Sequence, residues 1–233
     1  MGEQHDRWAL IINPKSGKKK FRQQIKYLFE NLEKNGVAYE YQFTRFAGHA
    51  QYIAARFVRQ NFKNFLVVGG DGTISEVVNG IFSTNPLHTS AMKLAIVPRG
   101  TGNDWARFWG LTRDYRHSIE VFLKQKTRLI DVGKVNYKLE DENLTHYFIN
   151  SVGFGLDAAV VRITNHLRRF FGSHSFLYFF ALLRAVFTYR ASKTELKFNG
   201  KISNKNLFTM NIANGCYSGG GMKQNPDALP YDG

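Results

Sequence analysis

The residues best suited to chemistry lie in a glycine-rich loop around Asp71. An apolar run at 65–68 leads directly into Gly69-Gly70-Asp71-Gly72-Thr73, and helical spacing follows. Glycines let backbone N–H groups approach a phosphate closely, and a helix start adds partial positive charge. An aspartate there can hold Mg²⁺ or bind a hydroxyl. An ordinary strand-to-helix turn, capped by Asp71 or Thr73, explains this loop equally well on its own.

Two more polar loops with glycines follow apolar runs. Asn13-Pro14-Lys15-Ser16-Gly17 precedes three lysines but lacks the spacing of a Walker A loop. Pro98-Arg99-Gly100-Thr101-Gly102-Asn103-Asp104 is the third such loop. Open parallel sheets bind ligands at the carboxyl ends of their strands. Three loops at successive strand ends therefore predict a phosphate-binding edge, although each one alone could be a plain turn.

The first half of the chain alternates strand and helix patterns, which would hold these loops at one edge. Strands are predicted at 8–12, 37–43, 65–68 and 93–97. Helical spacing predicts helices at 21–32, 51–60 and 74–82. We therefore expect an α/β ATP-binding domain with a largely parallel sheet at residues 1–130.

A β-rich, β-sandwich-like second domain is expected at residues 131–233. Strand patterns occur at 127–137, 146–152, 192–199 and 206–213, with a helical stretch at about 156–188. Gly153-Phe154-Gly155-Leu156-Asp157-Ala158 fits the dinucleotide fingerprint, but no acidic residue follows about 20 positions later, so we do not expect a Rossmann site. The final Tyr231-Asp232-Gly233 is typical of a turn into another strand, and we expect this domain to be truncated.

The composition favours anionic partners. Lys plus Arg is 32 and Asp plus Glu is 18, which gives a net charge of +14. This charge suits nucleic acid, phosphate compounds or an anionic membrane without choosing among them. The single cysteine, Cys216, excludes an internal disulfide framework, and no apolar run suggests a signal peptide or a membrane span. We expect a cytoplasmic protein that associates peripherally with membranes.

The segment 168–190 combines aromatic and basic residues. Its phenylalanines and tyrosines are interleaved with Arg168, Arg169, Arg184 and Arg190. A buried helix between two domains explains this pattern as well as an interfacial helix whose arginines face anionic headgroups. Stacking on single-stranded nucleic acid is a weaker interpretation, because the run is too apolar for a wet groove.

The three loops together resemble the diacylglycerol kinase catalytic domain family. That family includes bacterial diacylglycerol kinases, related lipid kinases such as sphingosine kinases, and shares its nucleotide fold with NAD kinases. The resemblance is carried by residues 13–17 (NPKSG), 69–80 (GGDGTISEVVNG) and 98–107 (PRGTGNDWAR). Ser75 stands where many members carry Asn, which is a small change between polar residues.

The resemblance implies ATP and Mg²⁺, with Asp71 as the catalytic residue. Thr44 matches the family because it directly follows the second strand. The implied ATP-binding residues are Asn13, Pro14, Lys15, Ser16, Gly17, Thr44, Gly70, Asp71, Gly72, Thr73, Ile74, Ser75, Glu76 and Thr101. Asp232 and the main-chain carbonyl of Leu229 match the positions of a structural Mg²⁺. Charge and place alone suggest that Lys15 or Arg99 helps to neutralise the phosphates.

These observations predict a lipid kinase that transfers the γ-phosphoryl group of ATP to the hydroxyl of a membrane lipid such as diacylglycerol. Its partners would be that lipid and an anionic membrane surface, with no nucleic acid, and a homodimer stays open. A kinase of a soluble substrate such as NAD would share the fold. A basic nucleic-acid-binding module would leave the three loops unexplained. The resemblance also implies a general base beyond residue 233, and Asp71 is the best substitute within the chain.

Overall fold

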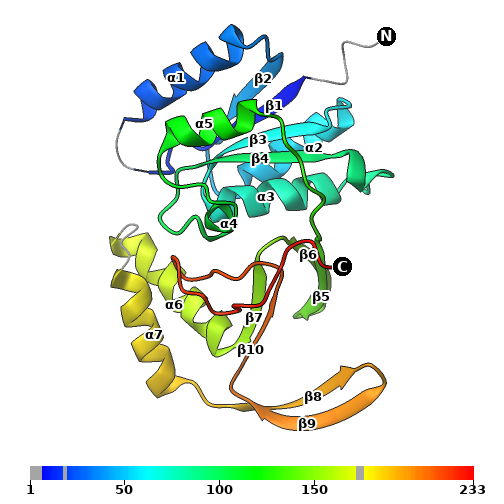
Figure 1. Ribbon diagram of the computed structural model, residues 1–233. Helices are drawn as coiled ribbons and strands as arrows, with labels where there is room; N and C mark the ends of the chain where they lie inside the picture. Colours follow the sequence, from blue (N-terminus) through cyan, green and yellow to red (C-terminus); the bar gives the residue numbers. More distant parts are fainter. Residues whose placement is uncertain (1–6, 18–19, 172–175) are drawn as a thin grey trace. The chain divides into compact units, whose positions relative to one another are not determined.

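The protein forms two compact units. The structure, a computed structural model, describes residues 7–17, 20–171 and 176–233. One unit comprises 1–150 and 214–233, and the other comprises Ser151–Ala213 (Figure 1). This division by compactness uses a different criterion from the change in strand pattern that predicted a boundary at 130, so that boundary stays a prediction.

The first unit is built on a four-stranded parallel sheet in the order β2-β1-β3-β4 (Figure 1). Its strands are β1 (Trp8–Ile12), β2 (Tyr39–Phe43), β3 (Asn64–Gly69) and β4 (Lys93–Pro98). Every residue of the two inner strands, β1 and β3, is buried, which explains why these strands are apolar apart from Asn64 at the start of β3. Since β1 lies between β2 and β3, the connection from β1 leads to one side of the sheet and the connection from β2 leads back to the other side of β1. Ligands of open α/β sheets bind at such a reversal, beside the carboxyl ends of the strands.

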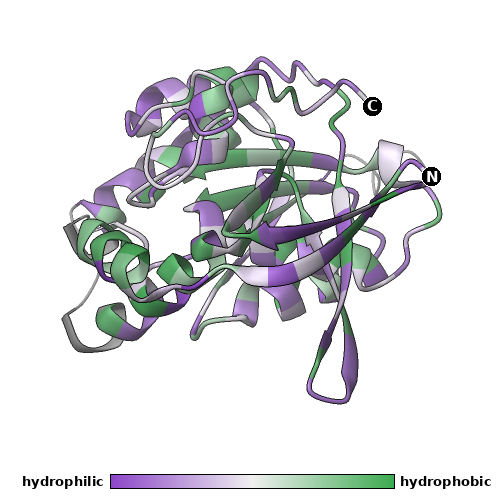
Figure 2. Cartoon of the chain, turned by 90° about the horizontal axis from the view of Figure 1, so that it is seen from below, coloured by the Kyte–Doolittle hydropathy of each residue, from purple (hydrophilic) through white to green (hydrophobic). Residues whose placement is uncertain are grey.

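Helices cover both faces of this sheet. The helices are α1 (Phe21–Lys34), α2 (His49–Arg59), α3 (Asp71–Phe82), α4 (Asp104–Phe108) and α5 (Tyr115–Leu123), with a 3₁₀ turn at Thr89–Ala91. Leu10 packs in the cluster that includes α1 and α5, whereas Ile11 packs in the cluster that includes α2 and α3. Side chains of adjacent strand residues thus pack in the cores on opposite faces of the sheet, as the alternation of side chains along a strand requires. Figure 2, coloured by hydropathy, shows hydrophobic and hydrophilic residues alternating along the helices.

A hairpin of β5 (Gly133–Leu139) and β6 (Glu142–Phe148) completes the regular elements of this unit. The side chain of Asn79 on α3 forms two hydrogen bonds with the main chain of β6. Its Nδ2 donates to the Tyr147 carbonyl at 2.9 Å, and its Oδ1 accepts from the Tyr147 N–H at 2.9 Å. The side chain is only 6% exposed, so α3 is tied to the hairpin by a buried pair of bonds. The predicted strand bounds are corrected here: the first strand begins at Gly133, and the second ends at Phe148.

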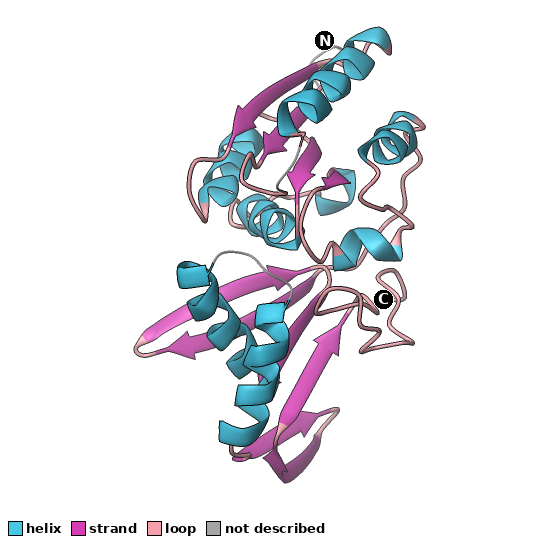
Figure 3. Ribbon diagram, turned by 90° about the vertical axis from the view of Figure 1, so that its left-hand side faces the viewer, coloured by secondary structure: helices cyan, strands magenta, loops and turns pink. Residues whose placement is uncertain are grey.

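In its described residues, 151–171 and 176–213, the second unit contains two antiparallel strand pairs and two helices (Figure 3). Its elements are β7 (Ser151–Gly155), α6 (Leu156–Phe171), α7 (Phe176–Thr188), β8 (Ser192–Phe198), β9 (Lys201–Leu207) and β10 (Thr209–Ala213). The predicted helical stretch is therefore two helices, which pack through Val160 of α6 and Ala181 and Ala185 of α7. The prediction of an α/β domain followed by a β-rich domain is confirmed. Within the part of the chain that the structure describes, no helix is both long and apolar enough to cross a membrane.

Candidate functional site

The predicted loops meet at the carboxyl edge of the parallel sheet. The Asn13 N–H donates to the Val68 carbonyl at 2.9 Å, which joins the end of β1 to the end of β3. The Arg99 N–H donates to the Gly69 carbonyl at 2.6 Å, which joins the end of β4 to β3. The loops that follow β1, β3 and β4 are therefore neighbours because their strands are neighbours. The structure brings together the three segments that sequence patterns placed at this edge.

The loop after β1 is held in shape by the side chain of Asn13. Its Nδ2 donates to Thr73 Oγ1 at 3.0 Å, across to the first turn of α3. Its Oδ1 accepts from the Lys15 N–H at 3.0 Å, and its carbonyl accepts from the Ser16 N–H at 3.2 Å. Gly17 then takes a positive φ of 74°, a conformation that favours glycine. One asparagine thus links two of the loops predicted to bind ATP.

Two glycines allow the loops after β3 and β4 to touch. A Cβ added to Gly70 would lie 2.7 Å from the Gly100 Cα, and a Cβ added to Gly100 would lie 2.7 Å from the Gly70 Cα. The Gly100 N–H also donates to Asn103 Oδ1 at 2.7 Å. The helix α3 begins directly after Gly70, so its N-terminal N–H groups face the same edge of the sheet. This arrangement suits an anionic group such as a phosphate.

Two carboxylates, those of Asp71 and Asp104, lie beside this contact. Asp71 Oδ1 accepts from the Trp105 N–H at 3.2 Å. A Cβ added to Gly102 would lie 3.1 Å from Asp71 Oδ2 and 3.2 Å from Asp104 Oδ2, so one small residue separates the two carboxylates. Burial, and secondly the charge of Asp104, raises the pKa of the Asp71 carboxyl, while backbone N–H groups at 103–105 oppose this rise. The site therefore concentrates negative charge in a poorly solvated place.

The acidic pair fits a divalent cation. Asp104 is 7% exposed, and its Oδ2 accepts from the Gly220 N–H at 2.9 Å. Its Oδ1 is buried without a hydrogen-bond partner in the structure. A buried carboxylate oxygen without a donor is costly, and a hard cation would satisfy it. Mg²⁺ often uses one or two carboxylates plus substrate phosphates, which is the number of carboxylates present here. Among the described residues no group of three or more His, Cys, Asp or Glu side chains could hold a metal ion.

Sequence reasoning included Asp104 in a quoted loop but did not name it as a site residue. The signal that could have found it is its position in the Gly-Thr-Gly-Asn-Asp run after a predicted strand. Its role depends on the proximity of Asp71, which follows from the pairing of β3 with β4.

Glu76 was predicted to bind ATP, and the structure places its carboxylate at the start of α2. Its two oxygens accept from the Gly48 N–H at 2.8 Å and the Ala50 N–H at 3.1 Å. An anionic group at a helix N-terminus is stabilising. The Thr44 N–H continues the sheet by donating to the Ile12 carbonyl at 2.8 Å. Glu76 therefore fixes the loop that carries Thr44, and a direct contact of either residue with ATP stays a prediction.

The remaining predicted ATP residues differ in accessibility. Ile74 is 1% exposed and belongs to the core, so only its main chain could face a ligand. Thr101 is exposed, and its carbonyl accepts a hydrogen bond from Arg113. Pro14, Ser16 and Ser75 are partly exposed. Their contacts with ATP stay predictions, as does the catalytic role of Asp71.

The residues predicted to hold a structural Mg²⁺ lie in the tail of the first unit. Leu229 is 41% exposed, and Asp232 is also exposed. Asp131 fixes this tail, because its N–H donates to the Pro230 carbonyl at 2.8 Å and its Oδ2 accepts from the Gly233 N–H at 3.0 Å. The tail is thus held by hydrogen bonds of its main chain to Asp131, and the Mg²⁺ role of Leu229 and Asp232 stays a prediction.

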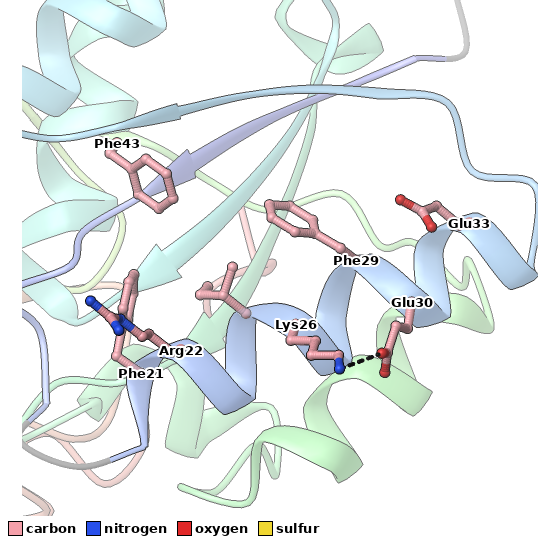
Figure 4. A pocket seen from close by; sticks show the side chains of 8 residues that line it. Phe21, Arg22, Lys26, Phe29, Glu30, Glu33 and Phe43 are labelled. Carbon is pink, nitrogen blue, oxygen red and sulfur yellow. Dashed lines mark ion pairs between the residues drawn. The ribbon is translucent and has the colours of Figure 1, made fainter.

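A surface groove of about 450 Å³ lies between α1 and β2, outside the predicted site (Figure 4). It is lined by aromatic and charged side chains and one aliphatic side chain: Phe21, Arg22, Ile25, Lys26, Phe29, Glu30, Glu33 and Phe43. Lys26 and Glu30 form an exposed ion pair at 3.7 Å along its rim. None of the residues predicted to bind ATP lines this groove.

In the second unit, the Gly153–Ala158 turn has a structural explanation. Gly155 has a φ of 73°, and a Cβ there would lie 2.5 Å from the Phe208 carbonyl oxygen. The Leu156 N–H donates to the same carbonyl at 2.9 Å. The small size and positive φ of Gly155 therefore allow β7, α6 and the start of β10 to meet, and the absence of a dinucleotide site at this turn stays a prediction.

The aromatic-basic segment is partly described. Arg184 and Arg190 are exposed, and within its own unit α7 exposes Phe179, Phe180, Leu183, Val186 and Phe187. Arg168 and Arg169 have side chains outside the described residues, as do the aromatic residues at 170, 171, 176 and 178. The choice between a buried and an interfacial helix therefore stays a prediction.

Comparison with known families matches both halves of the chain. Residues 7–135 match the diacylglycerol kinase catalytic domain, and residues 150–233 match the YegS C-terminal NAD kinase beta sandwich-like domain. The first match includes all three polar loops and the acidic pair. The second match covers the unit that contains β7 to β10, and it also covers the tail at 214–233, which belongs to the first unit.

Individual proteins show the same similarity along nearly the whole chain. The chain is 28% identical over 230 residues to a diacylglycerol kinase of Staphylococcus carnosus, covering 97% of this chain and 70% of that protein. It is 29% identical over 231 residues to a diacylglycerol kinase of Bacillus subtilis, covering 97% and 71%. The crystal structure of a diacylglycerol kinase from Bacillus anthracis has a TM-score of 0.65 at 22% identity, covering 98% of this chain and 71% of that one. At that identity the structural likeness concerns the fold alone.

Proposed function

Because the chain belongs to the diacylglycerol kinase catalytic domain family, we propose that it is a lipid kinase that transfers the γ-phosphoryl group of ATP to the hydroxyl of a membrane lipid such as diacylglycerol. The observation that carries this proposal is the meeting of three glycine-bearing loops and a carboxylate pair at one edge of the parallel sheet. Phosphoryl transfer needs positioning and charge neutralisation more than covalent help from the protein. This edge offers both.

The loops bind and orient the phosphates in this proposal. The N–H groups of Gly70, Asp71 and Gly72, at the start of α3, donate to phosphate oxygens, and the N-terminus of α3 adds its dipole. The 13–17 loop shapes the site, because its N–H groups at Asn13, Lys15 and Ser16 already bond within the chain. Asn13 keeps these two loops in register through its bond to Thr73. Such preorganised donors lower the barrier because they do not reorganise when charge develops.

Asp71 and Asp104 would hold Mg²⁺, and bound Mg²⁺ would neutralise charge on the phosphate oxygens. The protein's own contribution is to orient both carboxylates. The Trp105 N–H orients Asp71, and the Gly220 N–H orients Asp104. Asp232 and the Leu229 carbonyl are proposed to hold a second, structural Mg²⁺ in the tail that Asp131 fixes.

The membrane part of the proposal rests on α7. Bulky apolar side chains that are exposed within its unit alternate along this helix with the exposed Arg184. Exposed apolar side chains can enter a membrane interface, and one basic side chain beside them contributes roughly 1 kcal/mol at an anionic surface. Contact with such a surface would bring the enzyme to a lipid acceptor.

The test is acceptor-dependent transfer from γ-³²P-labelled ATP. Parallel reactions contain total lipid extract, NAD or no acceptor, each with and without Mg²⁺. Labelled lipid formed only with Mg²⁺ supports the proposal, and mass spectrometry of the product identifies the lipid. Labelled NAD would replace the lipid acceptor with a soluble one. The variant Asp141→Asn is a suitable control for charge loss, because Asp141 is exposed in the turn between β5 and β6 and lies outside the loops and the tail.

A further inference from the structure

Arg99, the first residue after β4, has a side chain that reaches the loop after β1. Its main-chain N–H extends the β3–β4 pairing through the Gly69 carbonyl at 2.6 Å. Its Nε donates to the Ser16 carbonyl at 3.1 Å. Since β3 lies between β1 and β4 in the sheet, this side chain crosses the end of β3 to reach Ser16.

The guanidinium is enclosed by the loop it contacts. A Cβ added to Gly17 would lie 3.3 Å from one terminal nitrogen of Arg99 and 2.9 Å from the Arg99 carbonyl oxygen. The Arg99 Cζ lies 5.1 Å from the centre of the Phe21 ring, at the start of α1. Gly17 and Phe21 thus bracket the side chain, and Arg99 is only 7% exposed.

This buried cation has no carboxylate partner among the described residues of the chain. The ion pairs found there involve other side chains, and the Ser16 carbonyl is the one acceptor that the Arg99 side chain is seen to contact. Burial lowers the pKa of the guanidinium, although an arginine stays charged at neutral pH. A desolvated charge without a counter-ion destabilises a folded protein. An anion that binds beside the guanidinium would remove this free-energy cost.

Resting on the proposed function, we propose that Arg99 is a positioning residue, which holds the 13–17 loop in place and sets a fixed positive charge next to the phosphates of the bound nucleotide. The bond to Ser16 and the enclosure by Gly17 and Phe21 fix the loop. The missing counter-ion is then supplied by the nucleotide, whose binding satisfies the buried charge. Arg99 thus acts in two ways, by fixing the loop through Ser16 and by placing its charge beside the phosphates, without touching the reacting atoms.

The test compares Arg99→Met and Arg99→Lys with the parent protein and with Arg59→Met. Arg59 is a matched control because it is an exposed arginine in the last turn of α2. Isothermal calorimetry measures affinity for ATP, AMP and adenosine. Hydrogen exchange of the backbone at 13–17 and the melting temperature are measured without nucleotide.

Arg99→Met is expected to weaken ATP binding by about 10- to 100-fold while adenosine binding changes little, because the lost group faces phosphates. Without nucleotide its melting temperature should stay within about 3 °C of the parent or rise, since a buried unpaired charge has been removed. Exchange at 13–17 should increase. Arg99→Lys should fall between Arg99→Met and the parent, because it keeps the charge but not the planar Nε donor.

Unchanged exchange at 13–17 in Arg99→Met would overturn the inference. So would an equal loss of ATP and adenosine binding with a lower melting temperature, which would indicate a general structural role. If the parent binds no ATP while exchange at 13–17 still rises in Arg99→Met, the proposed function fails and the positioning of the loop by Arg99 stands.

Discussion

Replacing Asp71 with Asn should separate activity from stability. Asn keeps an oxygen that can accept the Trp105 N–H bond, but it removes the charge. The carboxylate oxygens of Asp71 and Asp104 flank one point at 3.1 and 3.2 Å, so they are at most about 6 Å apart. At an effective dielectric constant of about 20, two unit charges at that distance repel by about 2–3 kcal/mol. A bond to a neutral amide is weaker than one to a carboxylate by about 1 kcal/mol.

The net expectation is that Asp71→Asn raises the free energy of unfolding of the metal-free protein by about 1–2 kcal/mol at pH 7 and low salt. Phosphoryl transfer should fall by a factor on the order of 10² or more, because a key electrostatic group has gone. The assays are urea unfolding in EDTA and lipid-dependent transfer from labelled ATP with Mg²⁺. Asp141→Asn, at an exposed position in the turn between β5 and β6, should change neither quantity.

The stability difference should also depend on pH. Since the folded-state pKa of Asp71 is raised above the ordinary value of 3.8 for an aspartate, the carboxyl contributes most to stability below that value. That contribution is lost as the pH rises through the folded pKa. Asp71→Asn has no such loss, so its advantage over the parent should be absent at about pH 3 and grow toward pH 7. A variant that is less stable at pH 7, or one with near-normal turnover, would refute the reasoning about the acidic pair.

Three further perturbations test other contacts. Asn79→Ala removes both bonds to the Tyr147 main chain and should cost about 2–4 kcal/mol in urea unfolding; a loss below about 0.5 kcal/mol would contradict the role of this latch. Glu76→Gln weakens the cap of α2 and should cost about 1 kcal/mol by the same assay, whereas a stabilised variant would oppose that role. The double variant Phe187→Ser, Arg184→Gln should reduce co-sedimentation with phosphatidylglycerol vesicles several-fold, since both side chains are exposed within their unit. Unchanged sedimentation would favour a core role for α7, or coverage by a second copy if light scattering shows a dimer.

The sheet and its loops were predictable because their signals are local. β1, and β3 after Asn64, are continuous apolar runs, and each ends at a polar loop with glycine or proline. Parallel pairing then places those ends at one edge, as the structure confirms. The pairing of β7 with β10 was not predictable in the same way. Its partners are far apart in the chain, and neither strand alone encodes the register.

The roles of polar residues on α3 were beyond sequence reasoning for a related reason. Glu76 and Asn79 belong to one motif and could both be taken for ligand-binding or surface groups. Their partners lie on α2 and β6, so their functions depend on how separate elements pack. The proximity of Asp104 to Asp71 likewise requires the strand order, which periodicity does not reveal. A local pattern can thus identify a reactive loop without identifying what each side chain in it contacts.

The contact between Gly70 and Gly100 restricts the evolution of this edge. Gly70 has a φ of −113° and a ψ of −170°, an extended conformation that any residue can adopt, so proximity rather than backbone geometry excludes larger side chains. Both partners are already the smallest residue, and no second mutation at either position can make room for a first. In most packed pairs, a larger residue at one position can be compensated by a smaller one at the other, but this pair cannot be compensated in that way. Selection from a library randomised at both positions should therefore return glycine at both. A larger side chain at either position would require the two loops to move apart, which would separate the N–H donors of one loop from those of the other.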